Sequence, residues 1–362
     1  MLIKCLILLS AVFNSLVVND DNTVSFCFCG TAKRVSVQTD MQFVGEDSTR
    51  YNDMHTRKFK MEKLSDGCFY VTTRPVQPET YTYSFRVNGK RKTDLHNNDT
   101  AWQMVHKWNI VSVGGSPQAD LYMQPQLKGQ LIQTKWYDPA ESIYRRVNIY
   151  LPAGYEQSVI SNQQSFFSVL YLLHGINGYE GSWLERGRVI QIIENLIAAD
   201  SIAPMIVVMP DCNTGVHEER PSHHTLWNNL WHYPRLCRDH SLELAIENLM
   251  QYMDTTYHVS NQRYIAGFSS GARIAANIVN RYPDKFQAVG LFSPVVYKEQ
   301  MPKTNIPPFY IYMGKDDMFI NNGRRFHKRL KKSGIDHFYM ENEGGHTWRN
   351  WRLYLSDFLK RL

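Results

Sequence analysis

The stretch RYIAGFSSGARIA, residues 263–275, decides the fold class of the larger part of this chain. It begins as an apolar run typical of a buried strand and continues from Ser270 with the periodicity of an amphipathic helix. Between the two lies Gly267-Phe268-Ser269-Ser270-Gly271, a Gly-x-Ser-x-Gly motif that places a serine on a sharp strand-to-helix turn. Glycine is needed on both sides because neighbouring backbone approaches such a turn closely. The stretch therefore predicts an α/β domain with a nucleophilic serine, Ser269, at the end of a strand.

The rest of residues 121–362 repeats this alternation of apolar strands and amphipathic helices. Strands that are apolar throughout are typical of a parallel sheet covered on both faces. The strands are expected at 166–175, 204–211, 263–269, 288–295, 308–314 and 337–344, and the helices at 188–201, 241–257, 270–282, 322–334 and 347–362. We therefore predict an α/β domain with a mostly parallel sheet over residues 121–362.

Partners for the serine stand at the ends of two later predicted strands. A serine hydroxyl becomes a good nucleophile only beside a base, usually a histidine that an acid orients. The strand 308–314 is followed by Asp316 and Asp317, and the strand 337–344 by His346. The order serine, acid, histidine is that of Gly-x-Ser-x-Gly hydrolases, and functional groups gather at the carboxyl ends of parallel strands. His346 is the predicted base, and either aspartate fits as the acid.

An oxyanion hole is expected beside the serine. In this class of site one donor is the backbone N–H after the nucleophile, here Ser270, and the other comes from a loop after an early strand. The segment LLHGING, residues 172–178, is such a loop, and Ile176 is the predicted second donor. His174 is expected to brace the loop, because His346 already supplies the base.

Residues 16–113 have a different pattern, with short β-rich runs and no convincing helix. Turn signals such as Asp66-Gly67 and Asn88-Gly89 separate the runs. This spacing predicts an all-β sandwich. The segment 114–120, rich in Gly, Ser and Pro, is predicted to be a linker.

Residues 1–15 contain Lys4 followed by the apolar run CLILLSAVFNS. An apolar run of this length after a positive charge is typical of a secretory signal peptide and is too short to span a bilayer. No A-x-A cleavage pattern follows, and the alternative is an N-terminal strand. The pattern predicts a signal peptide, a periplasmic or secreted protein and no membrane span.

Composition excludes several classes of protein. Hydrophobic residues make up 43% and charged residues 20% of the 362 residues, which excludes a disordered chain. The 40 Lys and Arg against 34 Asp and Glu give a formal charge of +6, and the basic run at 324–332 fits the solvated face of an amphipathic helix. We therefore expect no nucleic-acid partner.

Cysteine and histidine spacing gives no metal signature. The five cysteines after residue 15 are too widely and oddly spaced for a disulfide framework or a zinc ribbon, although one bridge such as Cys212 with Cys237 is possible. The histidine-rich loop 212–240 lacks the short spacings of metal ligands. We expect no metal and no cofactor.

Aromatic residues near the predicted site are candidates for substrate binding, because aromatic faces stack on both acyl groups and sugars. The candidates are Trp183, Trp227, Trp231 and Trp348. Core packing is an equally good interpretation for Trp348. In the first domain, Trp102 and Trp108 fit a sandwich core better than a glycan site.

Residues 120–362 resemble the putative-esterase branch of the α/β-hydrolases, which includes carbohydrate esterase family one feruloyl and acetyl-xylan esterases, S-formylglutathione hydrolase and enterochelin esterase. The resemblance implies the α/β-hydrolase fold, with the nucleophile at Ser269, the base at His346 and the acid at Asp317, three residues after Gly314. Six segments carry the likeness: VLYLLHGINGYEGSW (169–183), ENLIAADSIAPMIVVMPD (194–211), RYIAGFSSGARIA (263–275), YPDKFQAVGLFSPVV (282–296), YMGKDD (312–317) and GGHTWRNWRLYLSDF (344–358).

Residues 79–97 of the first domain resemble the early-set immunoglobulin-like modules that precede such esterases. Together the two resemblances imply a serine esterase whose partner is a polysaccharide-linked ester, a feruloyl or acetyl ester of xylan. An esterase for a siderophore such as enterochelin is the alternative enzyme, and a noncatalytic glycan-binding protein is the alternative without catalysis. The sequence does not determine the oligomeric state.

Charge near the site favours a xylan ester over a siderophore as the substrate. A loop whose positive and negative charges nearly cancel gives a polyanionic iron complex little Coulomb attraction. The loop at 211–240 carries three arginines against four acids: Arg220, Arg235 and Arg238 against Asp211, Glu218, Glu219 and Asp239.

Overall fold

The computed structural model describes residues 14–362 except 48–50, 54, 104–105, 126–127, 140–141, 157–165, 177, 214–240, 298–299 and 303–305. The chain divides into two compact units, Met1–Met123 and Gln124–Leu362. The segment 114–120 is more than the linker that we predicted, because it contains helix α2 (Pro117–Asp120) and belongs to the first unit. The Ser116 hydroxyl caps this helix by accepting the Ala119 N–H at 3.1 Å.

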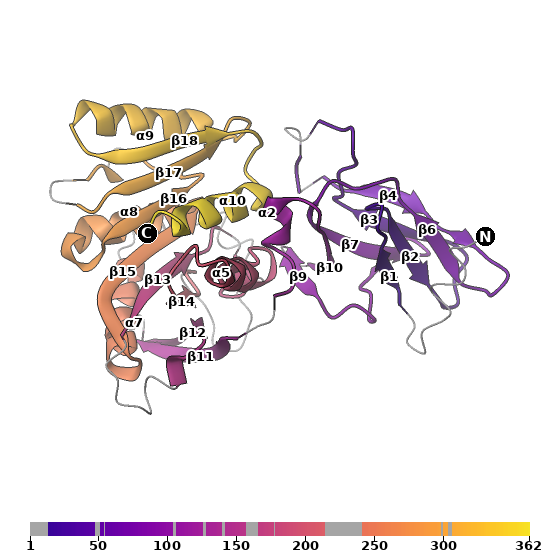
Figure 1. Ribbon diagram of the computed structural model, residues 1–362, viewed down its shortest axis with the longest axis horizontal. Coiled ribbons are helices and arrows are strands. Elements are labelled where there is room, and N and C mark those ends of the chain that lie inside the picture. Colours follow the sequence, from indigo (N-terminus) through magenta and orange to yellow (C-terminus); the bar gives the residue numbers. More distant parts are fainter. Residues whose placement is uncertain are drawn as a thin grey trace. The chain divides into compact units, whose positions relative to one another are not determined.

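The first unit consists of antiparallel sheets (Figure 1). One sheet has the strand order β1-β2-β6-β5, and the other has the order β4-β3-β7-β10-β9, with β8 paired to β7. Apolar side chains of both sheets, such as Phe26, Val37 and Phe85, form one core. The strands are β1 (Leu16–Val18), β2 (Val24–Phe28), β3 (Val35–Thr39), β4 (Arg57–Lys60), β5 (Glu62–Lys63), β6 (Phe69–Thr72), β7 (Glu79–Val87), β8 (Lys90–Lys92), β9 (Thr100–Gln103) and β10 (His106–Val113). The β-rich first unit agrees with the sequence pattern.

Ser15 belongs to the first unit, although we assigned it to the signal peptide. Its hydroxyl donates to the Asp94 carboxylate, and its carbonyl accepts the Cys27 N–H at 2.8 Å. The next residues form β1, which pairs with β2. The folded unit therefore begins before residue 16, and residues 1–13 of the predicted signal peptide lie outside the described residues.

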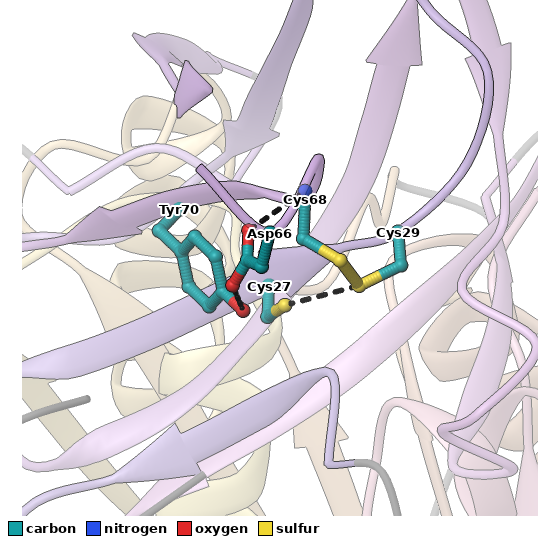
Figure 2. Close-up of a disulfide and its surroundings, with 5 residues drawn as sticks. All are labelled: Cys27, Cys29, Asp66, Cys68 and Tyr70. Carbon is teal, nitrogen blue, oxygen red and sulfur yellow. Dashed lines mark hydrogen bonds between the residues drawn. A yellow bond between two sulfur atoms is a disulfide. The ribbon is translucent and has the colours of Figure 1, made fainter. Parts of the chain in front are cut away.

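A disulfide joins Cys29 to Cys68, next to the buried thiol of Cys27 (Figure 2). Phe28 pairs with Phe69, so the residues that follow β2 and precede β6 face each other across the two strands. The Cys27 sulfur lies 3.8 Å from that of Cys29, on the same side of the strand, and burial raises the pKa of the Cys27 thiol. Cys212 is buried and free, and Cys237, the partner that we considered for it, lies outside the described residues.

The second unit is built on a mostly parallel sheet of order β11-β12-β14-β13-β15-β16-β17-β18. The pairings of β12 with β11 and with β14 are antiparallel, and those from β14 through to β18 are parallel. The strands are β11 (Gln130–Asp138), β12 (Ile143–Leu151), β13 (Phe167–Leu173), β14 (Met205–Pro210), β15 (Val259–Phe268), β16 (Ala288–Phe292), β17 (Phe309–Gly314) and β18 (His337–Asn342). The predicted parallel strands are all present.

Helices cover both faces of this sheet. Side chains of α7, α8 and α9 share a core with one set of alternating strand residues, including Tyr171 and Ile311. The opposite set faces α10, where Phe292 contacts Phe358 and Tyr312 stacks on Tyr354. The helices are α4 (Ser182–Glu185), α5 (Val189–Ala198), α7 (Ser241–Thr256), α8 (Ser270–Arg281), α9 (Ile320–Lys332) and α10 (Trp348–Leu359), with a short 3-10 turn at Pro283–Lys285. Two helical layers thus bury the apolar strands that the sequence predicts.

Across the residues that the structure describes, no helix has both the length and the apolar character that crossing a membrane requires.

Candidate active site

Ser269 occupies a strained turn between β15 and α8. Its backbone has φ 55° and ψ −118°, a conformation that residues with a side chain rarely adopt. The Ser269 N–H donates to the Phe292 carbonyl at 2.9 Å, which ties the turn to the end of β16. The strand-to-helix turn predicted from the sequence is therefore present, with Ser269 at its apex.

Close backbone contacts explain the glycines around this turn. A Cβ on Gly271 would lie 2.4 Å from the His174 carbonyl oxygen, and one on Gly175 would lie 3.2 Å from the Ser269 Cβ and closer still to the Phe268 ring. Any larger residue at either position would force the turn and the loop after β13 apart. The proposed nucleophile and the proposed oxyanion loop are thus in direct contact.

Asp317 and His346 form a hydrogen-bonded pair at the ends of β17 and β18. His346 Nδ1 lies 2.9 Å from Asp317 Oδ2, and the other carboxylate oxygen accepts the Phe319 N–H at 2.8 Å. The Asp317 side chain has no exposed surface, whereas that of His346 is 14% exposed. A buried, doubly hydrogen-bonded carboxylate holds the imidazole with Nδ1 protonated, which leaves Nε2 as the basic atom. Asp316 is exposed, so of the two aspartates that fit the sequence Asp317 is the one paired with His346.

Aromatic rings enclose His346, and this arrangement was not predicted from the sequence. The Trp351 ring meets that of His346 edge to face at 5.0 Å, and the Phe319 ring approaches at 5.2 Å. Trp351 also stacks on Phe268, the residue before Ser269, at 4.0 Å. One tryptophan of α10 therefore contacts both the histidine and the turn that carries the serine.

Ser293 fixes the position of Trp351. It follows β16 with φ 47°, and its hydroxyl accepts the Trp351 indole N–H at 3.1 Å. Its own N–H donates to the Tyr312 carbonyl at 2.8 Å. A serine directly after a buried strand was the available sequence signal, but its partner lies 58 residues away in α10.

His174 braces the loop after β13, as we expected. Its Nδ1 lies 2.8 Å from the Gly175 carbonyl, and its Nε2 accepts the Cys212 N–H at 2.9 Å. With both ring nitrogens engaged, His174 joins the ends of β13 and β14. The loop then continues to Ile176, and Ser270 begins α8, where the first N–H groups lack partners within the helix.

The tryptophans that were candidates for substrate binding differ in where the structure places them. Trp183 is 1% exposed, and its indole N–H donates to the Leu173 carbonyl at 3.0 Å, so the prediction that it binds substrate is wrong. Trp348 is 7% exposed and packs edge to face on Trp183 and Phe268, which supports core packing. Trp227 and Trp231 lie outside the described residues. In the first unit Trp108 is a core residue, 4% exposed.

Comparison with known proteins relates part of the second unit to a described family. The family model described as "Putative esterase" matches residues 143–304, which contain the strained serine turn and the bracing histidine. The match covers less than half of the chain and lies within the second unit. The paired Asp317 and His346 lie beyond the matched residues, at the ends of the next two strands of the same sheet.

Curated relatives carry esterase names. The chain is 27% identical over 310 residues, 83% of its length, to an "Endo-1,4-beta-xylanase/feruloyl esterase" of Xylanibacter ruminicola, and 38% identical over 63 residues, 17% of its length, to an "Acetyl esterase" of Caldicellulosiruptor saccharolyticus. The aligned regions cover 41% and 24% of these two relatives, respectively.

Solved structures confirm the α/β-hydrolase fold. A ferulic acid esterase of Anaeromyces mucronatus, in complex with ferulic acid, superposes with a TM-score of 0.53 at 20% identity and covers 74% of this chain and 97% of its own. The enterobactin esterase of Shigella flexneri superposes with a TM-score of 0.61 at 14% identity and covers 96% of this chain and 94% of its own.

Proposed function

We propose that the second unit is a serine carboxylic-ester hydrolase with Ser269 as nucleophile, His346 as base and Asp317 as orienting acid. The observation that carries this proposal is the buried Asp317–His346 pair, which stands in the same sheet as the strained serine turn. An oriented histidine and a serine on a strand-to-helix turn are the parts that acyl transfer requires.

In the proposed mechanism, His346 Nε2 takes the proton of the Ser269 hydroxyl as the oxygen attacks the ester carbonyl. The N–H groups of Ile176 and Ser270 stabilise the oxyanion of the tetrahedral intermediate. Asp317 stabilises the imidazolium, which then protonates the leaving alcohol. Water, activated by the same histidine, releases the acid from the acyl enzyme and restores Ser269.

The proposed substrate is a feruloyl or acetyl ester on xylan. The names of the curated relatives support this choice, because one combines xylanase with feruloyl esterase and the other is an acetyl esterase. A siderophore ester is the second candidate, and the fit to the enterobactin esterase over 96% of this chain favours it. The balanced charges predicted for the loop at 211–240 count against a polyanionic substrate, although residues 214–240 of that loop lie outside the described residues.

The proposed export of the protein has one support besides the N-terminal sequence. Disulfides such as Cys29–Cys68 persist mainly in oxidising compartments, including the periplasm and the extracellular space.

A panel of esters tests the proposed function. Initial rates are measured for methyl ferulate, p-nitrophenyl acetate, acetylated xylan and ferric enterochelin, with the Ser269→Ala protein as the matched control on each. We expect hydrolysis of methyl ferulate or acetylated xylan that the control lacks. Preference for the siderophore would overturn the xylan assignment. Failure to hydrolyse any of the four by a folded protein would overturn the esterase and favour a noncatalytic glycan-binding protein.

A further inference from the structure

A basic hollow lies on the first unit, and its lining residues all belong to that unit. It measures about 380 Å³, within the range of sites that hold small ligands. Four of its lining side chains are basic: Arg34, Lys58, Lys60 and Arg86. Among the described residues that line it, none is acidic and none is aromatic.

Strand register explains why the charges converge. Ser36 in β3 pairs with Lys60 in β4 and with Arg86 in β7, and Arg86 pairs with Arg91 in β8. Directly paired residues project from the same face of a sheet, so these four form one row across four strands. With strands about 4.8 Å apart, the basic residues on either side of Ser36 stand about 10 Å apart. Lys58 lies two residues from Lys60 and extends the same face.

Within the part of the chain that the structure describes, no ion pair joins an acid to a basic side chain of the hollow. Arg86 donates through Nε to the Gln38 side-chain oxygen at 2.6 Å and through Nη1 to the Gly89 carbonyl at 3.3 Å, and both acceptors are neutral. These bonds hold the guanidinium in place and leave its charge available. The opposite face of β4 differs, because Arg57 there forms an ion pair with Glu46 at 2.6 Å.

Two basic groups near the hollow have lowered pKa values. Burial and the nearby charge of Arg86 both lower the pKa of Arg91. Burial also lowers the pKa of His106, and the charges of Arg91 and Arg86 add to that effect. Fixed cations that already repel one another gain from an anion that binds between them.

We propose that the basic hollow binds an acidic sugar chain through its carboxylates. The planar guanidinium of Arg86 suits a bidentate contact with one carboxylate of the sugar chain. Lys58, Lys60 and Arg34 offer further positive charges for the next carboxylates of that sugar chain. A neutral glycan is disfavoured because the lining offers no aromatic ring to stack on, and Trp108 is covered by Arg91, whose guanidinium lies 3.9 Å from the ring centroid. The preference for a carboxylate follows from the basic lining of the hollow alone, whereas the choice of a sugar chain rests on the proposed function.

Calorimetric titration of the 362-residue chain tests this proposal. The ligands are a de-esterified oligogalacturonide and its carboxyl-reduced, neutral counterpart, so no ester hydrolysis takes part. We expect the acidic oligosaccharide to bind and the neutral one not to bind, and we expect high salt to weaken binding. Lys58→Gln with Lys60→Gln should weaken binding at least about tenfold. The matched control, Lys63→Gln with Lys107→Gln, removes the same charge from the first unit outside the hollow and should stay within about twofold.

Three outcomes would overturn the proposal: no binding of the acidic oligosaccharide, equal loss in both double variants, or stronger binding of polyphosphate or single-stranded DNA of matched charge. The rate on p-nitrophenyl acetate, measured on the same samples, separates this proposal from the esterase. Lys58→Gln with Lys60→Gln should leave that rate unchanged, and a protein without hydrolytic activity that still binds the oligosaccharide would contradict the esterase alone.

Discussion

His346 Nδ1 lies 2.9 Å from Asp317 Oδ2, while the second oxygen of the same carboxylate accepts the backbone N–H of Phe319 at 2.8 Å. Two N–H donors therefore converge on one buried carboxylate. Only a group with two accepting oxygens satisfies both, which is why an acid, and not an amide, is required at this position.

Asp317→Asn should lower kcat/KM by orders of magnitude, up to about 10⁴-fold. Asparagine has one accepting oxygen, so its amide NH₂ must face either the Phe319 N–H or the histidine and favours the wrong imidazole tautomer. The measurement is kcat/KM on p-nitrophenyl acetate or on the best ester of the panel. Asp316→Asn is the matched control, since Asp316 is exposed, and a larger loss in Asp316→Asn than in Asp317→Asn would refute the assignment.

Ser269→Ala should reduce turnover by at least about 10³-fold, because members of a catalytic triad act as a unit. The neighbouring Ser270→Ala keeps the backbone N–H that we assign to the oxyanion hole and should lose less than about tenfold. Covalent labelling by a fluorophosphonate gives an independent readout, with mass spectrometry locating the modified serine. Labelling of Ser270 in the unmutated protein would show that the nucleophile is misassigned.

Trp351→Leu should lower kcat by about 10-fold to 10²-fold with a smaller change in KM, since small displacements of a catalytic group are costly. Trp351 contacts His346 and Phe268 and is itself held by Ser293. We therefore assign it a positioning role and expect Trp351→Phe, which keeps an aromatic contact, to recover part of the loss. The pH profile of kcat/KM distinguishes this role from a structural one, because a displaced histidine shifts the acidic limb, whereas a merely less stable protein leaves the limb in place.

The Glu341 carboxylate should make the free energy of unfolding depend on pH in the acidic range. Hydrogen bonds from Arg324, at 2.8 and 2.7 Å, lower the pKa of the Glu341 carboxyl to about 2 in the fold. An unfolded glutamate titrates near 4.3, so the unfolded state binds more protons between these values. The stability that the ionised Glu341 carboxylate adds to the fold is therefore fully present above about pH 5. It is lost as the pH falls through about 2.

The measurement is the melting temperature of Glu341→Gln against the unmutated protein at several pH values. The melting temperature of the variant should be only slightly below that of the unmutated protein at pH 7, because the Arg324–Glu341 pair is near the surface. This difference should vanish toward pH 2. Arg324→Gln should reproduce this pattern. A deficit that grows on acidification would contradict the assignment.

The sequence by itself determined the local elements and the order of the proposed catalytic residues. Apolar runs such as 204–211 and the periodic helix 270–282 appear where predicted, because backbone geometry imposes a period on which side chains are buried. The positions of Ser269 and His346, and of an acid at 316 or 317, followed from the same pattern, since parallel strands bring their carboxyl ends to one edge. The choice of Asp317 came from the family resemblance.

Only the tertiary structure decided which distant residues meet. Trp183 was a candidate for substrate binding on its sequence alone, and only the structure shows that its indole N–H donates to the Leu173 carbonyl inside the core. The Cys29–Cys68 disulfide, the bond from Trp351 to Ser293 and the row of Lys60, Ser36, Arg86 and Arg91 all depend on strand or helix pairing across many residues. Local periodicity carries no information about that register, because the same alternation of side chains is compatible with many partners, and a shift by one residue turns every side chain to the other face.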